Sequence, residues 1–195
     1  YKWISRYNSG DTFGAYQFVA SIAIDATTYA DTTTDSQLGE SLSDVSYDAP
    51  PDDLKGICYI GNGMLAGFSG KDLCISEPYK PWAWPQAYRQ SFPAAIVATK
   101  TSGETLIVLT EEGPFIATGI DPLSIIPLPV PIKISCVSKR AVVSHGTIVC
   151  FPGQDGLYVI SSGGVKNFTE ARFDYQEWQA LFPSTLHATI CNDKY

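Results

Sequence analysis

The chain is poor in basic residues. Its 195 residues include 13 lysines and arginines against 20 aspartates and glutamates, which gives a formal net charge of −7. The densest basic pair is Lys139-Arg140. Because affinity for phosphates comes mainly from clustered Lys and Arg, this composition argues against a protein that grips nucleic acid. An acidic protein can still surround DNA, since its wall repels the phosphates and lets them slide.

Long helical and hydrophobic runs are also missing. Thirteen prolines and sixteen glycines are spread along the chain, which favours short elements separated by turns. The least charged stretch, residues 113–132, contains Asp121 and five prolines, so it is excluded as a membrane helix. The best helix candidate, residues 170–182, offers only about three turns.

The sequence contains no CxxC pair. Its five cysteines lie far apart at Cys58, Cys74, Cys136, Cys150 and Cys191. The odd number and the apolar neighbours favour buried free thiols over a disulfide framework. Free thiols predict folding in a reducing compartment. No signal peptide opens the sequence, and it begins with Tyr1 rather than Met, so we expect a piece of a longer polypeptide.

Internal repetition is the most informative pattern that is present. Three segments each read as a hairpin, with an apolar strand, a polar turn and a second apolar strand. The segments cover residues 63–75, 104–116 and 146–160, and their turns contain Gly70, Gly113 and Gly156. The anchors Leu65, Leu106 and Ile148 are 41 and 42 residues apart, and 42 more lead to Ile190.

A period near 40 built of short strands is what a four-stranded propeller blade requires. Helical repeats of similar length would need helical periodicity, which these segments lack. The continuous apolar runs fit inner strands that are covered on both faces by neighbouring blades. We therefore predict an all-β chain with about three four-stranded blades and the start of a fourth, with all four anchors on corresponding inner strands.

Residues 1–50 differ from the repeats. Strand-like segments occur at residues 1–7, 16–24 and 27–29, with a turn at 8–11 and a Thr/Asp-rich loop at 32–36. This pattern predicts part of a β-sandwich of fibronectin type III character. Residues 48–53 predict a stiff, solvated linker, because two prolines stand among acidic residues. The expected domains are therefore residues 1–50 and 51–195.

Residues that carry chemistry in other proteins have ordinary explanations here. Gly61-Asn62-Gly63-Met64-Leu65-Ala66 fits a dinucleotide fingerprint, but a strand follows it, so a hairpin turn is favoured. His145 and His187 fall at equivalent repeat positions, which would lie apart in successive blades and form no zinc site. The paired acids, such as Glu111-Glu112, sit in turns and linkers as solvated charge. We expect no catalytic, cofactor-binding or metal-binding residues.

The most unusual stretch, residues 76–85, combines aromatic residues and prolines. Its candidate partner-contacting residues are Tyr79, Pro81, Trp82 and Trp84. Such a loop can bind sugars or partner proteins, since rigid aromatics give large contact area at low entropic cost. It can equally pack over a blade edge, and the two roles are compatible. A structural loop predicts that both tryptophans are buried, whereas a glycan site predicts that both are exposed.

Several short motifs, in matching order, resemble structural proteins from the tail modules of double-stranded DNA phages. They are Leu54-Lys55-Gly56, Gly61-Asn62-Gly63-Met64-Leu65-Ala66-Gly67-Phe68, Ser76-Glu77-Pro78-Tyr79 through Trp84-Pro85, Val108-Leu109-Thr110, Ala117-Thr118-Gly119 with Asp121-Pro122, and Cys136-Val137-Ser138-Lys139-Arg140. The likeness spans roughly residues 14 to 183. Within that group the chain looks most like the nozzle or tail-tube proteins of short-tailed phages, which are usually several times longer.

The resemblance implies a structural role in the virion tail and no enzyme activity or cofactor. Such proteins contain a propeller platform flanked by β-domains, and they assemble as rings, typically hexamers, beneath the portal and adaptor. The implied partners are other copies of the chain, the portal, the adaptor and other tail proteins, and genomic DNA that passes without specific binding. Assembly is expected in the cytoplasm of the bacterial host. A receptor- or glycan-binding tail propeller is the alternative, and a tail-associated hydrolase is the weakest hypothesis.

Overall fold

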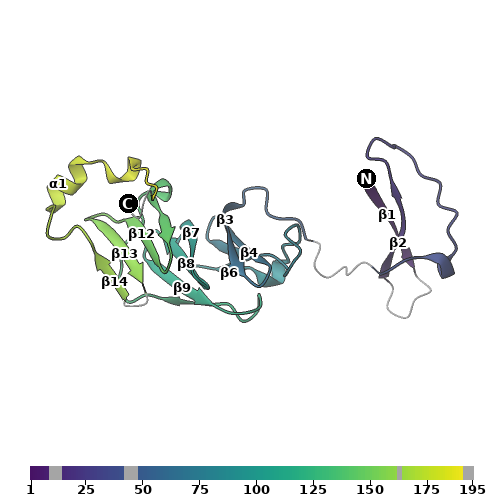
Figure 1. The fold of residues 1–195 in the computed structure, drawn as a ribbon, viewed down its shortest axis with the longest axis horizontal. Coiled ribbons are helices and arrows are strands. Elements are labelled where there is room, and N and C mark those ends of the chain that lie inside the picture. The colour runs from purple at the N-terminus through teal and green to yellow at the C-terminus, as the bar shows by residue number, and fades with distance from the viewer. Residues whose placement is uncertain (9–14, 42–47, 162–163, 191–195) are drawn as a thin grey trace. The chain divides into compact units, whose positions relative to one another are not determined.

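The computed structural model describes residues 1–8, 15–41, 48–161 and 164–190, and it divides the chain into two compact units. The units are Tyr1–Tyr47 and Asp48–Tyr195 (Figure 1), so they divide three residues before the expected boundary. Within the described ranges the chain is mostly β, with four small antiparallel sheets and no closed barrel.

The first unit is built on one antiparallel hairpin, β1 (Lys2–Asn8) with β2 (Ala15–Ile22). Trp3 on β1 packs edge-on against Phe18 on β2, with ring centroids 5.6 Å apart. The chain after β2 returns to this strand, where the Gly39 N–H donates to the Phe18 carbonyl. The expected turn at residues 8–11 lies mostly outside the described residues. Residues 27–29, expected as a strand, form none.

Ion pairs hold the returning segment of this unit. Arg6 on β1 reaches Asp31 at 3.0 Å and Asp35 at 2.6 Å, and Asp35 begins the short 3-10 helix η1 (Asp35–Gln37). The Thr33 backbone N–H also donates to Asp31, and this hydrogen bond is the main cause that lowers the Asp31 pKa. Both acids therefore fasten a segment without regular structure to β1.

The second unit contains three four-stranded antiparallel sheets, and each follows the order of the sequence. Sheet 1 consists of β3 (Lys55–Gly61), β4 (Met64–Ser69), β5 (Asp72–Ile75) and β6 (Gln90–Ser91). Sheet 2 consists of β7 (Ile96–Ser102), β8 (Thr105–Thr110), β9 (Pro114–Thr118) and β10 (Ile126–Pro129). Sheet 3 consists of β11 (Val143–His145), β12 (Ile148–Pro152), β13 (Leu157–Ser161) and β14 (Gly164–Asn167).

The three predicted hairpins are β4–β5, β8–β9 and β12–β13. Leu65, Leu106 and Ile148 lie at the start of the second strand of their sheets, so the repeat describes real structural equivalence. The prediction for Ile190 is wrong, because this residue lies outside any strand. The Ala188 N–H instead donates to the Arg140 carbonyl, so the end of the described chain lies along the segment before β11.

Sheet 2 is buried on both faces, as the continuous apolar run of β8 predicts. Leu106 and Val108 belong to a core shared with sheet 1, while Ile107 and Leu109 belong to a core shared with sheet 3. Successive strand residues point to opposite faces, so one strand supplies both cores. Phe92 and Phe115 meet edge-on in the first core, with centroids 4.8 Å apart.

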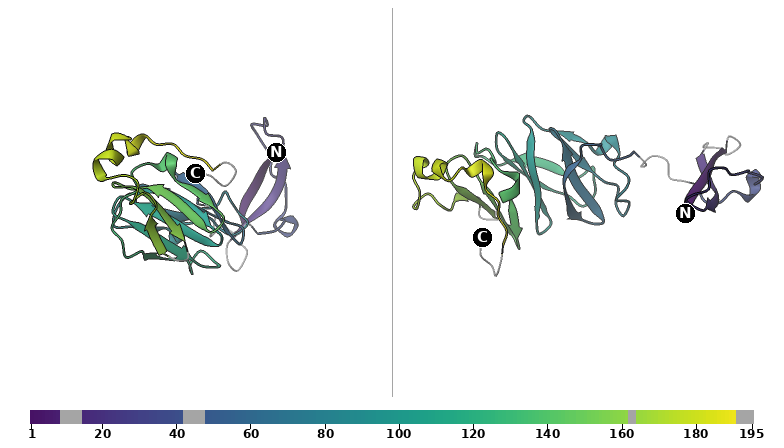
Figure 2. Two further views of the ribbon diagram at one scale, coloured as in Figure 1. Left: turned by 60° about the vertical axis from the view of Figure 1, so that its left-hand side comes forward. Right: turned by 90° about the horizontal axis from the view of Figure 1, so that it is seen from above.

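The first strands of the three sheets lie side by side. β7 contacts β3 of sheet 1 and β11 of sheet 3, and each of these strands forms an edge of its sheet. The views in Figure 2 show the three sheets following one another in chain order. The stack therefore has one edge where first strands adjoin and an opposite edge formed by the last strands.

A short helix, α1 (Tyr175–Ala180), lies inside the predicted interval and is shorter than it. Its N-terminus has a capping box, in which Asp174 and Glu177 each accept the other's backbone N–H. Buried Trp178 donates from its indole nitrogen to the Gly153 carbonyl at 3.0 Å, which ties the helix to sheet 3. The remaining 3-10 helices are η3 (Gln86–Tyr88), η4 (Lys139–Ala141) and η5 (Pro183–Thr185).

The segment expected as a stiff, solvated linker, residues 48–53, is hydrogen-bonded to the second unit. The Asp48 carbonyl accepts the Trp84 N–H at 2.8 Å, and its carboxylate accepts the Gln86 N–H at 3.0 Å. Asp53 accepts a hydrogen bond from Ser69 on β4 at 2.6 Å. The three acids of this segment are exposed, as predicted, and two of them also accept hydrogen bonds from the second unit.

Truncation of Leu109 tests the two-faced burial of sheet 2. Leu109 is 1 % exposed, whereas Leu128 on the edge strand β10 is 65 % exposed. We expect Leu109→Ala to lower the free energy of unfolding by about 2–5 kcal/mol, and Leu128→Ala to change it by less than about 0.5 kcal/mol. Urea unfolding followed by circular dichroism measures both, and equal losses would contradict the described packing.

Candidate functional site

The aromatic loop over residues 76–85 is an ordered extension of sheet 1. The Ser76 N–H donates to the Leu65 carbonyl at 2.8 Å, and the Ser76 hydroxyl accepts the Leu65 N–H at 2.9 Å. Further along, the Glu77 N–H donates to the Ala83 carbonyl at 2.9 Å and closes the loop on itself. Two backbone hydrogen bonds and one to the Ser76 hydroxyl therefore order the start of the loop.

Trp84 anchors the loop. Its side chain is 2 % exposed, and its indole N–H donates to the Pro81 carbonyl at 2.9 Å. A buried indole needs such a partner, since an unpaired buried donor costs about 1–3 kcal/mol. This residue therefore behaves as the structural interpretation predicts.

Trp82 and Tyr79 behave in the opposite way. They are 56 % and 75 % exposed, and Pro81 between them is exposed as well. A structural loop predicted that both tryptophans are buried, and this holds for Trp84. A glycan site predicted that both are exposed, and this holds for Trp82. One loop carries a structural anchor and an exposed aromatic surface.

Backbone strain fixes the position of Tyr79. Its φ is +59°, a left-handed conformation that is uncommon for residues other than glycine. The Tyr79 N–H donates to the Gly63 carbonyl at 2.8 Å, and a Cβ on Gly63 would lie 2.5 Å from the tyrosine ring. The glycine in the β3–β4 turn is therefore required for the ring to lie against it.

An exposed face of sheet 1 adjoins this tyrosine. Cys58 and Ile60 on β3 lie against the core shared with sheet 2, so Tyr59 between them points to the other face, and it is exposed. The Tyr59 hydroxyl is 3.4 Å from the Gly63 backbone nitrogen, so Tyr59 and Tyr79 converge on one glycine. The sequence analysis did not identify this outer face of sheet 1.

A second apolar surface also escaped sequence analysis. The hairpin that joins β9 to β10 exposes four large apolar side chains: Ile120, Leu123, Ile126 and Leu128. Asn62 and Gln90 of sheet 1 donate to the Ile120 and Ile125 carbonyls, each at 2.6 Å. The hairpin is therefore held firmly while its apolar side chains face outward.

The thiols are free and shielded. Cys58, Cys74, Cys136 and Cys150 form no disulfide, which confirms the prediction for these four, and Cys191 lies outside the described residues. Burial raises the pKa of Cys58 to about 11 and that of Cys136 to about 12. Because the thiolate is the reactive form, neither residue is suited to nucleophilic or redox chemistry.

The other predicted site features fall as follows. Across the described ranges, no group of three or more His, Cys, Asp or Glu residues could hold a metal ion. His187 accepts a hydrogen bond from Arg140, with 3.2 Å between the nitrogens.

Asn62 and Gly63 have φ values of +50° and +72°, the signs of a type I′ hairpin turn, so the glycine fingerprint is a turn between strands. No helix in the described part is long and apolar enough to cross a membrane.

Comparisons with known proteins leave the family open. No protein-family model matches the sequence, and no curated protein matches it either. The likeness of its short motifs to phage tail proteins therefore enters only as a proposal.

The split between the two tryptophans can be tested by matched substitutions. We expect Trp84→Ala to lower the free energy of unfolding by about 3–5 kcal/mol, because a large buried ring leaves a cavity. Trp82→Ala should cost less than about 1 kcal/mol, since its ring already faces solvent. Urea unfolding followed by tryptophan fluorescence measures both, and a larger loss for Trp82 would reverse the assignment.

Proposed function

We propose that this chain is a structural component of a phage virion tail, a nozzle or hub segment in an oligomeric conduit for genome ejection. One observation carries the proposal. The first strands of the three stacked four-stranded sheets, β3, β7 and β11, lie next to one another at one edge. In a β-propeller, first strands of successive blades face a central axis in this manner. We therefore assign the three sheets to successive blades.

The motifs of the resemblance fall on this repeating part. They occupy the β3–β4 hairpin, the aromatic loop, strands β8 and β9, and the segment before β11. These positions include the turn that contacts Tyr79 and the strand that supplies both cores. The likeness thus concerns packing and turn geometry, as expected for proteins that share an architecture.

We assign the first unit to part of a fibronectin-III-like sandwich. An isolated two-stranded hairpin is marginally stable in water, so it needs a partner layer. Trp3 and Tyr7 on β1 and Tyr16 on β2 are exposed large aromatics, which such a layer would cover. In the proposed assembly this unit is a β-domain that flanks the propeller.

Ring formation has a candidate surface on the outer face of sheet 1. Tyr59 stands exposed on the outer face of a strand whose Cys58 and Ile60 contact the core shared with sheet 2. Aromatic side chains are enriched in protein interfaces, and stacked sheets already bury the equivalent faces elsewhere in this unit. A further sheet from a neighbouring subunit is the natural cover in a ring, for which the resemblance implies six copies.

Receptor or glycan binding is the second candidate function, and the exposure of Tyr79 and Trp82 favours it. Exposed aromatic rings on a rigid loop suit stacking against sugars or a receptor protein. This function is compatible with a tail position, since a tail component can both conduct DNA and contact the host.

Localisation and assembly test the proposal in the phage that encodes the chain. Gold-labelled antibodies against the chain should decorate the tails of purified particles. We expect Tyr59→Asp to reduce the number of complete particles, because a charge on the outer face of sheet 1 opposes burial. Tyr175→Asp, at an exposed position on α1, serves as the matched substitution.

Trp82→Ala separates the two functions. Normal particle numbers and normal adsorption are expected if the loop has no receptor role. Intact particles that fail to adsorb would favour the receptor function over a conduit alone. An absence of the chain from purified particles would overturn both.

A further inference from the structure

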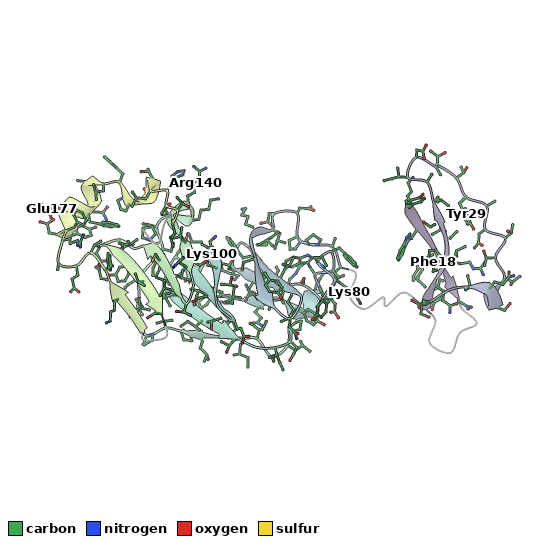
Figure 3. The ribbon with its side chains drawn as sticks, in the orientation of Figure 1. Phe18, Tyr29, Lys80, Lys100, Arg140 and Glu177 are labelled. Carbon is green, nitrogen blue, oxygen red and sulfur yellow. The ribbon has the colours of Figure 1, made fainter. Side chains whose placement is uncertain are left out.

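The fold gathers four basic side chains at one pocket. Lys55, Lys100, Lys139 and Arg140 line a cavity of about 410 Å³ between sheets 1 and 2 and the segment before β11. Figure 3 labels Lys100 and Arg140, which come from β7 and η4. These are four of the thirteen lysines and arginines in a chain with a net charge of −7. We call this cavity the basic pocket.

Nothing in the described part neutralises the basic pocket. None of its lining residues is an Asp or Glu, and the salt bridges of the described residues involve only Arg6. The Arg140 guanidinium donates to the His187 ring, and the Arg140 carbonyl accepts the Ala188 N–H. These contacts with His187 and Ala188 hold Arg140 in place and involve no acidic side chain.

The basic pocket lies where the first strands of the sheets adjoin. Lys55 begins β3 and Lys100 lies on β7, while Lys139 and Arg140 form most of the short helix that leads into β11. The pocket therefore opens among the adjoining first strands, which the proposed propeller architecture places toward the central axis of the blades. Four basic side chains that line one pocket, with no Asp or Glu in its lining, suit an anion with closely spaced charges.

We propose that the basic pocket binds phosphate groups of the DNA backbone. The assignment to DNA rests on the proposed function, whereas the anion site rests on the pocket itself. Phosphates are held through Lys and Arg without reading base sequence. The site would give the acidic conduit a local point of contact with the passing genome, in place of a wall that only repels it.

DNA binding by the purified chain tests this proposal. Fluorescence anisotropy with a short labelled duplex should show sequence-independent binding that weakens as KCl rises from about 50 to 200 mM. Four phosphate contacts correspond to a slope of about −3 to −4 in log K against log salt. We expect the triple variant Lys100→Gln/Lys139→Gln/Arg140→Gln to lose at least about tenfold in affinity and about 3 in slope.

A charge-matched variant supplies the control. Lys71→Gln/Lys133→Gln/Lys166→Gln removes three exposed lysines that do not line the basic pocket, and it should retain most of the affinity. If the pocket triple variant unfolds, the pair Lys55→Gln/Lys139→Gln at two exposed positions replaces it, with an expected loss of about 2 in slope.

Three outcomes would overturn the proposal. These are equal losses in both triple variants, binding of inorganic phosphate without binding of duplex, and altered self-association with unchanged DNA binding, which would assign the pocket to an acidic protein partner. Because the measurement uses purified chain, its failure leaves the tail assignment standing. Loss of the chain from purified particles would in turn leave the anion site standing.

Discussion

The double-sided burial of sheet 2 is the constraint on which the second unit depends. β8 sends Leu106 and Val108 into one core and Ile107 and Leu109 into the other, so neither neighbouring sheet has a core of its own without it. Small antiparallel sheets are marginal alone, and stacking is how they bury enough apolar surface. The same constraint explains the repeat, because each sheet must present equivalent apolar strands at equivalent places.

Stacking also decides which surfaces remain for function. A stack has end faces, and the outer face of sheet 1 leaves Tyr59 exposed beside the strained Tyr79. It also has an edge where first strands adjoin, and there the basic pocket forms. Within the described residues, burial raises the pKa of the Cys58 and Cys136 thiols, and no group of His, Cys, Asp or Glu could hold a metal ion. These properties suit a protein that acts by packing against partners.

Sequence patterns predicted the repeated hairpins well and the surfaces poorly. Leu65, Leu106 and Ile148 could be found because strand pairing and two-sided burial leave continuous apolar runs. Ile190 matched the spacing but makes no strand, since spacing alone does not supply a pairing partner. Composition gives the net charge of the chain but does not show where the charged side chains lie in the fold. The lysines of the basic pocket lie about one repeat apart in sequence, so they meet only once the sheets stack.

Native-state hydrogen exchange on the full chain tests the central claim most directly. If sheet 2 supplies both cores, the slowest amides of β4, β8 and β12 should exchange with one common free energy of opening. Ile107→Ala should lower that value equally in all three strands, although its side chain touches only the core shared with sheet 3. Exchange of β4 that is unaffected by this substitution would contradict the account, because sheet 1 would then be stable without the rest of the stack.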